Sequence, residues 1–275
     1  MGRRSEMKKT VDGLILRESI VGESDKLLTV LTAQGKIYLR AKGVRSIKSK
    51  NLSLCRAFNY GNFEYYEKNG MCWLSGGSSH SSFFALGGDV VDFALAAYIC
   101  DVAVEITGEE TDSQDILRVT LNSLYAIDKT QKNRELIKGA FELYAAAHSG
   151  FAPELDRCRK CAEERAESFF VDIMNGNCLC ERCLSELSRA VLENEVDRYA
   201  ARNILLPVSA SAITAARYVL FADPARLFAF ELTDKKDLSD FSRLAETYLL
   251  NHLERGFDTL DFYKSVQKPL DTEEK

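Results

Sequence analysis

Two cysteine pairs with the same spacing constrain this chain more than any other feature. The first pair is Cys158-Arg-Lys-Cys161, and after eighteen intervening residues the second is Cys180-Glu-Arg-Cys183. A two-residue spacer lets both thiolates of a pair turn toward one point, and two such pairs can surround a zinc ion at about 2.3 Å. Four sulfurs leave the ion no open position for water. The sequence therefore predicts one structural Zn²⁺ ion, in an insertion at about residues 156–185.

The segment between the pairs leaves one ligand open. A short strand at residues 168–173, followed by the turn Asn175-Gly-Asn177, predicts a small hairpin. Cys178 is a third candidate in the second pair. We favour Cys180, because its two-residue spacing to Cys183 matches the first pair, and Cys178 stays an alternative. Two disulfides would require an oxidising compartment, which nothing else in the sequence indicates.

The composition is that of an ordinary globular protein with room for two domains. The chain has 275 residues, of which 46% are hydrophobic and 28% charged. No run approaches the roughly 18 apolar residues of a membrane span, and the first residues lack the apolar core of a signal peptide. These features predict a cytoplasmic protein with reduced thiols and no membrane partner.

The first third of the chain has the alternating pattern of β-strands. We predict five strands, at residues 11–16, 26–32, 36–41, 58–66 and 71–74. Asn69-Gly70 joins the last two, and this dipeptide favours a type I′ hairpin because both turn residues need positive φ. Five short strands in about seventy residues are the right size for an OB-type barrel. We place this barrel at residues 8–85.

From Asp89 onward the hydrophobic period changes to that of helices. We predict helices at 89–108, 112–129, 135–149, 184–200, 207–221 and 239–255, with Ser239 capping the last. The tail from Lys264 is polar, and we expect it to be mobile. The predicted fold is an α+β multidomain protein: an OB-fold barrel, then an all-helical domain at 86–275 with the four-cysteine knot inserted.

Charge is distributed unequally along the chain. Residues 1–85 carry 14 basic and 7 acidic side chains, a net charge of +7, whereas residues 86–275 carry 22 and 34, a net charge of −12. Such asymmetry suggests that the basic part contacts nucleic acid. Between Arg40 and Arg56 there is no acidic residue. The candidate DNA-binding residues are Lys36, Arg40, Lys42, Arg45, Lys48, Lys50 and Arg56.

These contacts would be to phosphates, and hence weakly sequence-specific and steeply salt-dependent. A solvated loop that serves solubility is the alternative interpretation of the basic segment. Aromatic side chains in the neighbouring strands could stack on bases, as in OB folds that hold single strands. We nevertheless expect Tyr38, Phe58 and Phe63 to belong to the barrel core.

Several motifs in a fixed order resemble the RecO family of DNA repair and recombination mediator proteins. In the first half they are Gly22-Glu-Ser-Asp25 with the strand after it, Gly35-Lys36, and Ala41-Lys-Gly-Val-Arg45 running into Lys48-Ser49. In the second half, Gly150-Phe-Ala-Pro-Glu-Leu-Asp-Arg-Cys158 leads into the two cysteine pairs. The resemblance spans roughly residues 8–189 and fades over the last eighty.

The resemblance implies an N-terminal OB fold and a helical domain, often with a four-cysteine zinc site. It implies binding of single- and double-stranded DNA and annealing of complementary strands. It also implies cooperation with RecR in loading RecA onto DNA coated by single-strand-binding protein, whose acidic C-terminal tail docks on the helical domain. Lys42, Arg45 and Lys48 fall in the family's basic DNA-contacting region, and the four cysteines fall on its zinc ligands. Association with the nucleoid would follow from DNA binding.

No catalytic motif is present. The sequence lacks a Walker phosphate loop, a His-Glu-x-x-His motif and a Gly-x-Ser-x-Gly motif, and it contains only 3 histidines. We therefore predict no enzymatic activity. One alternative is a zinc-containing, sequence-specific DNA-binding regulator that reads a major groove with helix 209–221. That segment offers only Arg217 as a basic reader. A zinc-stabilised enzyme with an unrecognised site is the other alternative.

Overall fold

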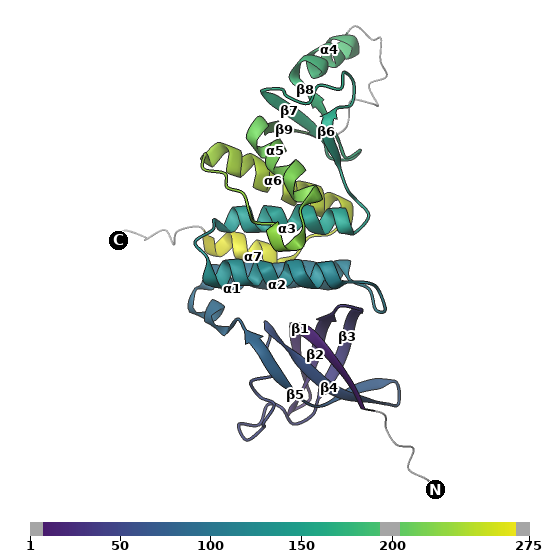
Figure 1. The fold of residues 1–275 in the computed structure, drawn as a ribbon, viewed down its shortest axis with the longest axis vertical. Helices are drawn as coiled ribbons and strands as arrows, with labels where there is room; N and C mark the ends of the chain where they lie inside the picture. Colours follow the sequence, from purple (N-terminus) through teal and green to yellow (C-terminus); the bar gives the residue numbers. More distant parts are fainter. Residues whose placement is uncertain (1–7, 193–203, 268–275) are drawn as a thin grey trace, which may run out of the picture. The chain divides into compact units, whose positions relative to one another are not determined.

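The computed structural model of the protein describes residues 8–192 and 204–267 (Figure 1). This part of the chain divides by its contacts into two compact units. The first contains the described residues up to Gln131 together with those from Phe257 onward, and the second runs from Lys132 to Gly256. The domain boundary after residue 85, where the hydrophobic period changes, stays a prediction.

The N-terminal strands form a closed barrel with the strand order β1-β2-β3-β5-β4. The strands are β1 (Lys8–Val21), β2 (Asp25–Thr32), β3 (Gly35–Ala41), β4 (Asn59–Lys68) and β5 (Met71–Ser82). Strands β3 and β5 pair in parallel, whereas the other neighbours in the barrel are antiparallel. The predicted OB-like barrel is confirmed.

Alternate side chains along the strands point into the barrel and fill its core. Ile15, Leu28, Leu39 and Phe63 are fully buried in one core cluster. At the β4–β5 hairpin, Asn69 and Gly70 have φ angles of 53° and 72°, so the predicted turn has the positive φ of a type I′ turn at both positions.

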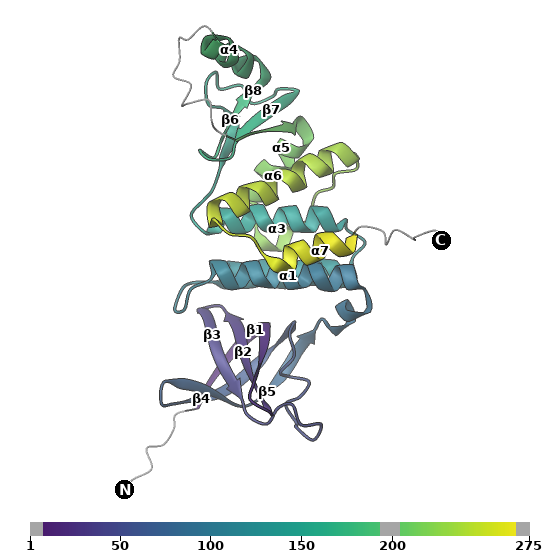
Figure 2. The same cartoon turned by 180° about the vertical axis from the view of Figure 1, so that it is seen from behind.

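Helices belong to the same unit as the barrel. They are the 3-10 helix η1 (Phe84–Gly88), α1 (Val90–Ile106), α2 (Gln114–Lys129) and α7 (Asp258–Gln267). Arg17 of β1 forms an ion pair with Asp101 of α1 at 2.5 Å, and Lys36 Nζ donates to Val104 O at 2.8 Å. Helix α7 lies beside α1 (Figure 2), and Thr259 Oγ1 donates to Asp101 Oδ2 at 2.9 Å.

The second unit combines helices with a four-stranded sheet of order β6-β8-β7-β9. The strands are β6 (Glu154–Cys158), β7 (Ser168–Asp172), β8 (Asn177–Cys180) and β9 (Leu205–Ser209). The helices are α3 (Arg134–His148), α4 (Glu181–Leu192), α5 (Ala210–Phe221), the 3-10 helix η3 (Pro224–Arg226) and α6 (Lys235–Leu253). The predicted hairpin between the cysteine pairs is the β7–β8 pair.

Helices α3 and α6 pack closely around a buried ion cluster. A Cβ atom at Gly139 would lie 2.8 Å from the ring of Phe241, so the two helices approach where α3 has no side chain. Lys138 Nζ lies 3.2 Å from Glu142 Oε2 and 2.9 Å from Glu246 Oε2. The side chains of Lys138 and Glu142 are 2% and 0% exposed. Because a buried charge without a partner is costly, this cluster fixes how α3 faces α6.

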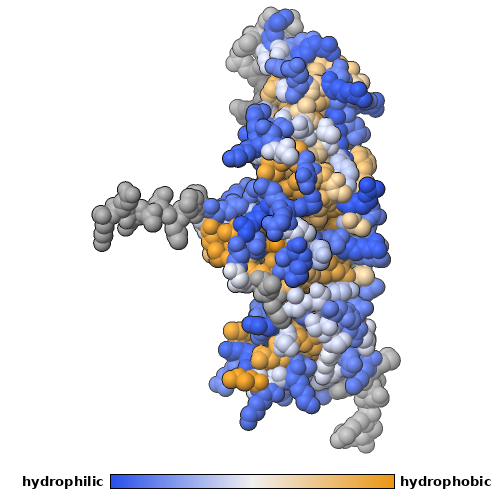
Figure 3. Space-filling model, turned by 60° about the vertical axis from the view of Figure 1, so that its left-hand side comes forward, coloured by the Kyte–Doolittle hydropathy of each residue, from blue (hydrophilic) through white to orange (hydrophobic). Residues whose placement is uncertain are grey.

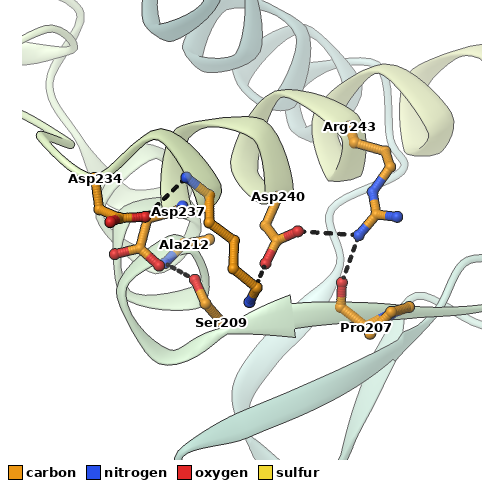
Figure 4. A network of polar contacts seen from close by, with 8 residues as sticks. Pro207, Ser209, Ala212, Asp234, Asp237, Asp240 and Arg243 are labelled. Carbon is orange, nitrogen blue, oxygen red and sulfur yellow. Dashed lines mark hydrogen bonds and ion pairs between the residues drawn. The ribbon is translucent and has the colours of Figure 1, made fainter.

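Polar contacts also join β9 to α6 (Figure 4). Arg243 Nη2 donates to Pro207 O and to Asp240 Oδ1, both at 3.0 Å. At the end of the strand, Ser209 caps α5, and its Oγ accepts the N–H of Ala212 at 3.2 Å. The strand and the two helices thus share one polar network.

Three details of the helical region differ from the sequence-based predictions. The helix predicted to begin at Pro207 does not begin there. Residues 205–209 form the strand β9 instead, because they pair with β7. The helix predicted from Ser239 begins at Lys235, where Asp234 caps it. Residues 264–267, expected to be part of a mobile tail, belong to α7. Of the helix predicted at 184–200, residues 193–200 lie outside the described residues.

Among the described residues, none of the helices is both long enough and apolar enough to cross a lipid bilayer. On the face shown in Figure 3, hydrophobic residues gather in separate patches among hydrophilic ones.

Candidate metal centre and nucleic-acid interface

Four cysteine sulfurs converge at one end of the small sheet. The Sγ atoms of Cys158, Cys161, Cys180 and Cys183 all lie within 4.8 Å of one another. Cys158 ends β6, Cys180 ends β8, and Cys183 lies in the first turn of α4. The strands therefore bring together two pairs that are distant in the sequence.

The sulfur geometry fits a tetrahedral metal ion. In a tetrahedron with metal–sulfur bonds of about 2.3 Å, neighbouring sulfurs are about 3.8 Å apart. Cys161 Sγ and Cys180 Sγ are separated by 3.7 Å. A disulfide would need a separation of about 2.05 Å. The four thiols are thus arranged as metal ligands rather than as disulfide partners.

Backbone groups around the cluster favour thiolates. Burial would raise the pKa of Cys158, but backbone N–H groups of Cys180, Cys161 and Lys160 outweigh it and lower that pKa to about 6. Burial and the neighbouring thiols raise the pKa of Cys183 to about 12. Since four negative sulfurs repel one another, a cation at their centre would favour the fully ionised set.

Cys178 lies apart from this cluster, in the interior of the sheet. Its Sγ contacts Leu155 O at 3.7 Å and Arg157 O at 3.3 Å. Burial raises the pKa of the Cys178 thiol to about 11. The structure therefore brings Cys180, and not Cys178, together with Cys183.

Arg217 of α5 contacts the segment that carries the four cysteines. Its Nε donates to Leu155 O at 2.7 Å and its Nη1 donates to Glu164 O at 2.8 Å. Its guanidinium carbon lies 5.0 Å from the centre of the Phe169 ring. The one basic side chain of helix 209–221 is thereby committed to a structural contact, which disfavours a major-groove recognition helix.

The basic loop, defined as residues 42–58, connects β3 to β4. Val44, Leu54 and Cys55 are 1%, 5% and 0% exposed and belong to the barrel core cluster. Asp25 holds the start of the loop: its Oδ1 accepts the N–H of Gly43 at 2.9 Å. The loop is therefore anchored in the barrel at several points.

Three of the candidate DNA-binding residues have partners within the protein. Lys36 Nζ donates to a carbonyl of α1, and Arg40 forms an ion pair with Asp25 at 3.1 Å. The Arg40 guanidinium also lies 5.2 Å from the centre of the Trp73 ring. Arg45 Nη1 donates to Glu23 O at 2.8 Å. Arg45 is thus bonded to the barrel from within the loop, whereas Lys36 and Arg40 lie on β3, before the loop begins.

The remaining candidates are exposed. The side chains of Lys42, Lys48 and Lys50 have no hydrogen bond or ion pair to any other residue that the structure describes; the one contact of Lys48 is its backbone N–H, which donates to Ser46 Oγ at 3.4 Å. Arg56 is also exposed. The three lysines are the cations of the basic loop that remain available to an anionic ligand.

The aromatic residues divide between core and surface. Phe58 and Phe63 are 5% and 0% exposed, as predicted. The prediction for Tyr38 is wrong: its side chain is 39% exposed, because Ile37 and Leu39 take the inward positions on β3.

Each histidine ring has a polar contact within the fold, and each also packs against an aromatic ring. His148 Nδ1 lies 3.0 Å from Tyr144 O, and His252 Nε2 lies 2.9 Å from Ile173 O. His80 Nε2 lies 3.2 Å from Asp12. None of these three rings is placed beside a cysteine or serine as the base of a nucleophile would be, among the contacts of the described residues.

Two residues that bear on the basic loop were not predicted from the sequence. Asp25 belongs to the Gly22-Glu-Ser-Asp25 motif, and its carboxylate anchors the loop by accepting the N–H of Gly43. Ile47, within the basic run, is 93% exposed. An apolar residue amid lysines was the available signal for Ile47, whereas nothing local could reveal the role of Asp25.

Comparison with known proteins gives a consistent match. The family model described as "Recombination protein O N terminal" matches residues 7–83, and the one described as "Recombination protein O C terminal" matches residues 87–261. The "DNA repair protein RecO" of Acetivibrio thermocellus is 26% identical over 257 residues, which cover 93% of this chain and 96% of that protein. The protein of the same name from Shouchella clausii is 30% identical, over 67% of this chain and 72% of its own.

Proposed function

The chain belongs to the RecO family of DNA repair proteins, and on that premise we propose that it is a recombination mediator that binds DNA without catalysing a reaction. It would bind single- and double-stranded DNA through phosphates and anneal complementary strands. With RecR, it would help to load RecA onto DNA coated by single-strand-binding protein. It would act in the cytoplasm, at the nucleoid when bound to DNA.

The observation that carries the DNA-binding proposal is the set of lysines on the anchored basic loop. Lys42, Lys48 and Lys50 are exposed, their ammonium groups have no partner in the described part of the chain, and no acidic residue lies between Arg40 and Arg56. Phosphates would meet a cationic surface whose backbone is already ordered. Less conformational entropy is then lost on binding than with a flexible tail.

Annealing follows from charge neutralisation and requires no catalytic residue. Two single strands repel each other through their phosphates, and cations that hold both strands reduce that repulsion. Binding to phosphates also leaves the base edges available for pairing.

We propose that Zn²⁺ is the metal held by Cys158, Cys161, Cys180 and Cys183. Thiolate ligands with tetrahedral spacing suit zinc, and a four-sulfur site gives the ion a structural role. The ion would fix the ends of β6 and β8 and the start of α4. RecR and the acidic tail of single-strand-binding protein are the proposed partners, and the tail would dock on the helical region.

Annealing of complementary single strands across a salt series tests the DNA surface. The informative variant replaces Lys42, Lys48 and Lys50 with Ala, since Arg45 and Arg40 have structural contacts whose loss would disturb the loop. We expect the slope of log affinity for single strands against log salt to fall by about 2, because each lost phosphate contact removes about 0.7. Annealing should be reduced on bare strands and on strands coated with single-strand-binding protein.

A matched control removes three exposed cations elsewhere, Arg118, Arg165 and Lys235. This variant has the same net charge as the loop variant and should anneal as the wild type does. Equal losses in both variants would mean that overall charge, and not the basic loop, determines binding. Wild-type protein that neither binds nor anneals DNA would contradict the proposed function itself.

A further inference from the structure

Ile47 is an unusually exposed apolar residue at the tip of the basic loop. Its side chain is 93% exposed, whereas the next most exposed large hydrophobic residue in the described part of the chain, Phe221, is 78% exposed. Arg45, Ser46 and Lys48 around it are exposed as well. Ile47 therefore projects alone from a cationic surface and belongs to no apolar patch formed with its chain neighbours.

The exposure is not the result of a loose loop. Ser46 N donates to Gly43 O at 3.3 Å and Ser49 N donates to Ser46 O at 2.9 Å, so consecutive turns fix the backbone on both sides of Ile47. Three residues earlier, Val44 is 1% exposed in the barrel core. The loop thus buries one β-branched side chain and, on the same anchored turn, presents the next one to solvent.

We propose that Ile47 inserts between neighbouring bases of the DNA whose phosphates the loop lysines hold. The inference rests on the proposed function, because it assigns the position of the bases once the phosphates are bound. Isoleucine is among the side chains that proteins insert as wedges between base steps. An exposed apolar tip flanked by Arg45, Lys48 and Lys50 offers both parts of that contact: cations for the backbone and an apolar surface for the base faces.

Insertion would give the loop a role beyond holding strands. A wedge separates stacked bases, and the resulting kink is local to the step it enters. Bases unstacked in this way are easier to pair with a complementary strand. The contact is with the faces of the bases, which every base has, so it adds no sequence specificity.

An anionic membrane surface is the other partner that a basic loop with an apolar tip could contact. Membrane binding strengthens with the apolar area that enters the bilayer. Ile47 provides a single side chain, and the residues on either side of it are polar or charged. The charge pattern together with the small apolar area favours DNA.

The test uses the full-length protein with short oligonucleotides that carry 2-aminopurine at several positions, as single strands and as duplexes. The fluorescence of 2-aminopurine is quenched by stacking and rises when a neighbouring base step opens. At saturating wild-type protein we expect a rise in fluorescence. With Ile47→Ser, also at saturation, we expect the rise to be lost, while binding weakens by less than about tenfold and its salt dependence is unchanged.

Ile20→Ser is the matched control. Ile20 lies on β1, outside the basic loop, and is 65% exposed, so the same change is made at another exposed position of the barrel. This variant should give the full rise. Ile47→Phe should restore or increase the signal lost in Ile47→Ser, because an aromatic wedge also fits between bases.

Each other outcome overturns the inference. If Ile47→Ser binds DNA and gives the wild-type rise, or if wild type binds without any rise, Ile47 does not insert and the proposed function still stands. If wild type does not bind DNA, both fail. If Ile47→Ser instead loses co-sedimentation with phosphatidylserine vesicles and keeps its 2-aminopurine signal, the tip is a membrane contact.

Discussion

The carboxylate of Asp25 accepts the backbone N–H of Gly43 at 2.9 Å, and its other oxygen accepts the Arg40 guanidinium at 3.1 and 3.2 Å. One side chain at the start of β2 thus fixes both the end of β3 and the first turn of the basic loop. The charge on the loop depends on its lysines, whereas the placement of that charge depends on this acid.

We predict that Asp25→Asn loosens the basic loop and leaves the barrel folded. The amide of asparagine presents N–H donors to the Arg40 guanidinium, which is itself only a donor, so the ion pair is lost. Backbone amides of residues 44–55 should exchange with deuterium faster than in wild type, and those of β1 and β4 at an unchanged rate. Hydrogen exchange read by mass spectrometry measures both.

Glu23→Gln provides the control, because it removes the same charge two residues away. The Glu23 side chain is exposed, and only its backbone carbonyl contacts Arg45. Exchange in the loop should remain that of wild type. Acceleration of equal size in both variants would show that local charge, and not the Asp25 contacts, orders the loop.

The contacts of Asp25 also predict when pH disturbs the loop. The Gly43 N–H, in the first place, and the Arg40 guanidinium hold the pKa of Asp25 below its ordinary value of 3.8, against the opposing effect of burial. A carboxyl with a lowered pKa contributes stability above its ordinary pKa and loses it as pH falls through the lowered one. The loop should therefore be unaffected from pH 8 to about pH 5 and change only below about pH 4.

Tryptophan fluorescence measures this transition, because Trp73 is the only tryptophan and the Arg40 guanidinium lies 5.2 Å from its ring centre. Wild type should show a change in emission below about pH 4, and Asp25→Asn should already have the altered emission at neutral pH. A wild-type transition centred near neutral pH would contradict this assignment.

The parts of the fold that could be predicted are those set by local pattern. Asn69-Gly70 determines its hairpin through the φ angles of two adjacent residues, and the spacing of the cysteine pairs places each pair of sulfurs together. Strand β9 could not be predicted in this way, because the segment around Pro207 forms a strand through its pairing with β7, which is distant in the sequence. The capping of α6 by Asp234 rather than Ser239 was likewise a choice between two plausible caps.

The candidate DNA surface illustrates the same limit. A run of basic residues identifies the segment, but not which cations are committed to the fold. Lys36 donates a hydrogen bond to a carbonyl of α1. Arg40 forms an ion pair with Asp25 and a cation–π contact with Trp73. These contacts join residues that are far apart in the sequence, so only the folded structure separates them from Lys42 and Lys48.

The cysteine cluster predicts that replacing a ligand cysteine removes the metal, whereas replacing Cys178 does not. We expect wild type to bind one zinc ion per chain and Cys161→Ser almost none, because three thiolates leave a coordination position unfilled. Cys178→Ser should keep the full ion, since the new hydroxyl can donate to the carbonyls of Leu155 and Arg157 that Cys178 contacts. Zinc content is measured on unfolded protein with a colorimetric chelator.

Loss of the metal should also loosen the knot. Metal binding and local folding are coupled in such sites, so amide exchange in β6, β8 and the start of α4 should accelerate in Cys161→Ser and not in Cys178→Ser. Zinc retained by Cys161→Ser, or lost from Cys178→Ser, would contradict the assignment of ligands. Protein that contains no zinc and is as stable as the metal-loaded form would contradict the structural role.

The buried cluster between α3 and α6 leads to a prediction about stability. Burial alone would lower the pKa of the Lys138 ammonium, but Glu142, Glu246 and Glu135 outweigh it and raise that pKa. Lys138→Met removes the cation that lies 3.2 Å from the buried carboxylate of Glu142. We expect the free energy of unfolding, measured in urea, to fall by about 3–5 kcal/mol. Lys138→Met with Glu142→Gln should recover part of this loss, because the second change removes the buried negative charge that Lys138 balances in the wild type.

Lys236→Met is the matched control, because Lys236 and Asp240 are also a pair four residues apart on a helix. The Lys236 side chain is 77% exposed, compared with 2% for Lys138. An exposed pair contributes at most about 1 kcal/mol, so this variant should be nearly as stable as wild type. Equal costs for Lys138→Met and Lys236→Met would show that the buried cluster does not hold the two helices together.

The raised pKa of Lys138 also sets the pH range in which the cluster stabilises the fold. The contribution of Lys138 to the free energy of unfolding is complete below the ordinary value of 10.5 and is lost as pH rises through the raised value.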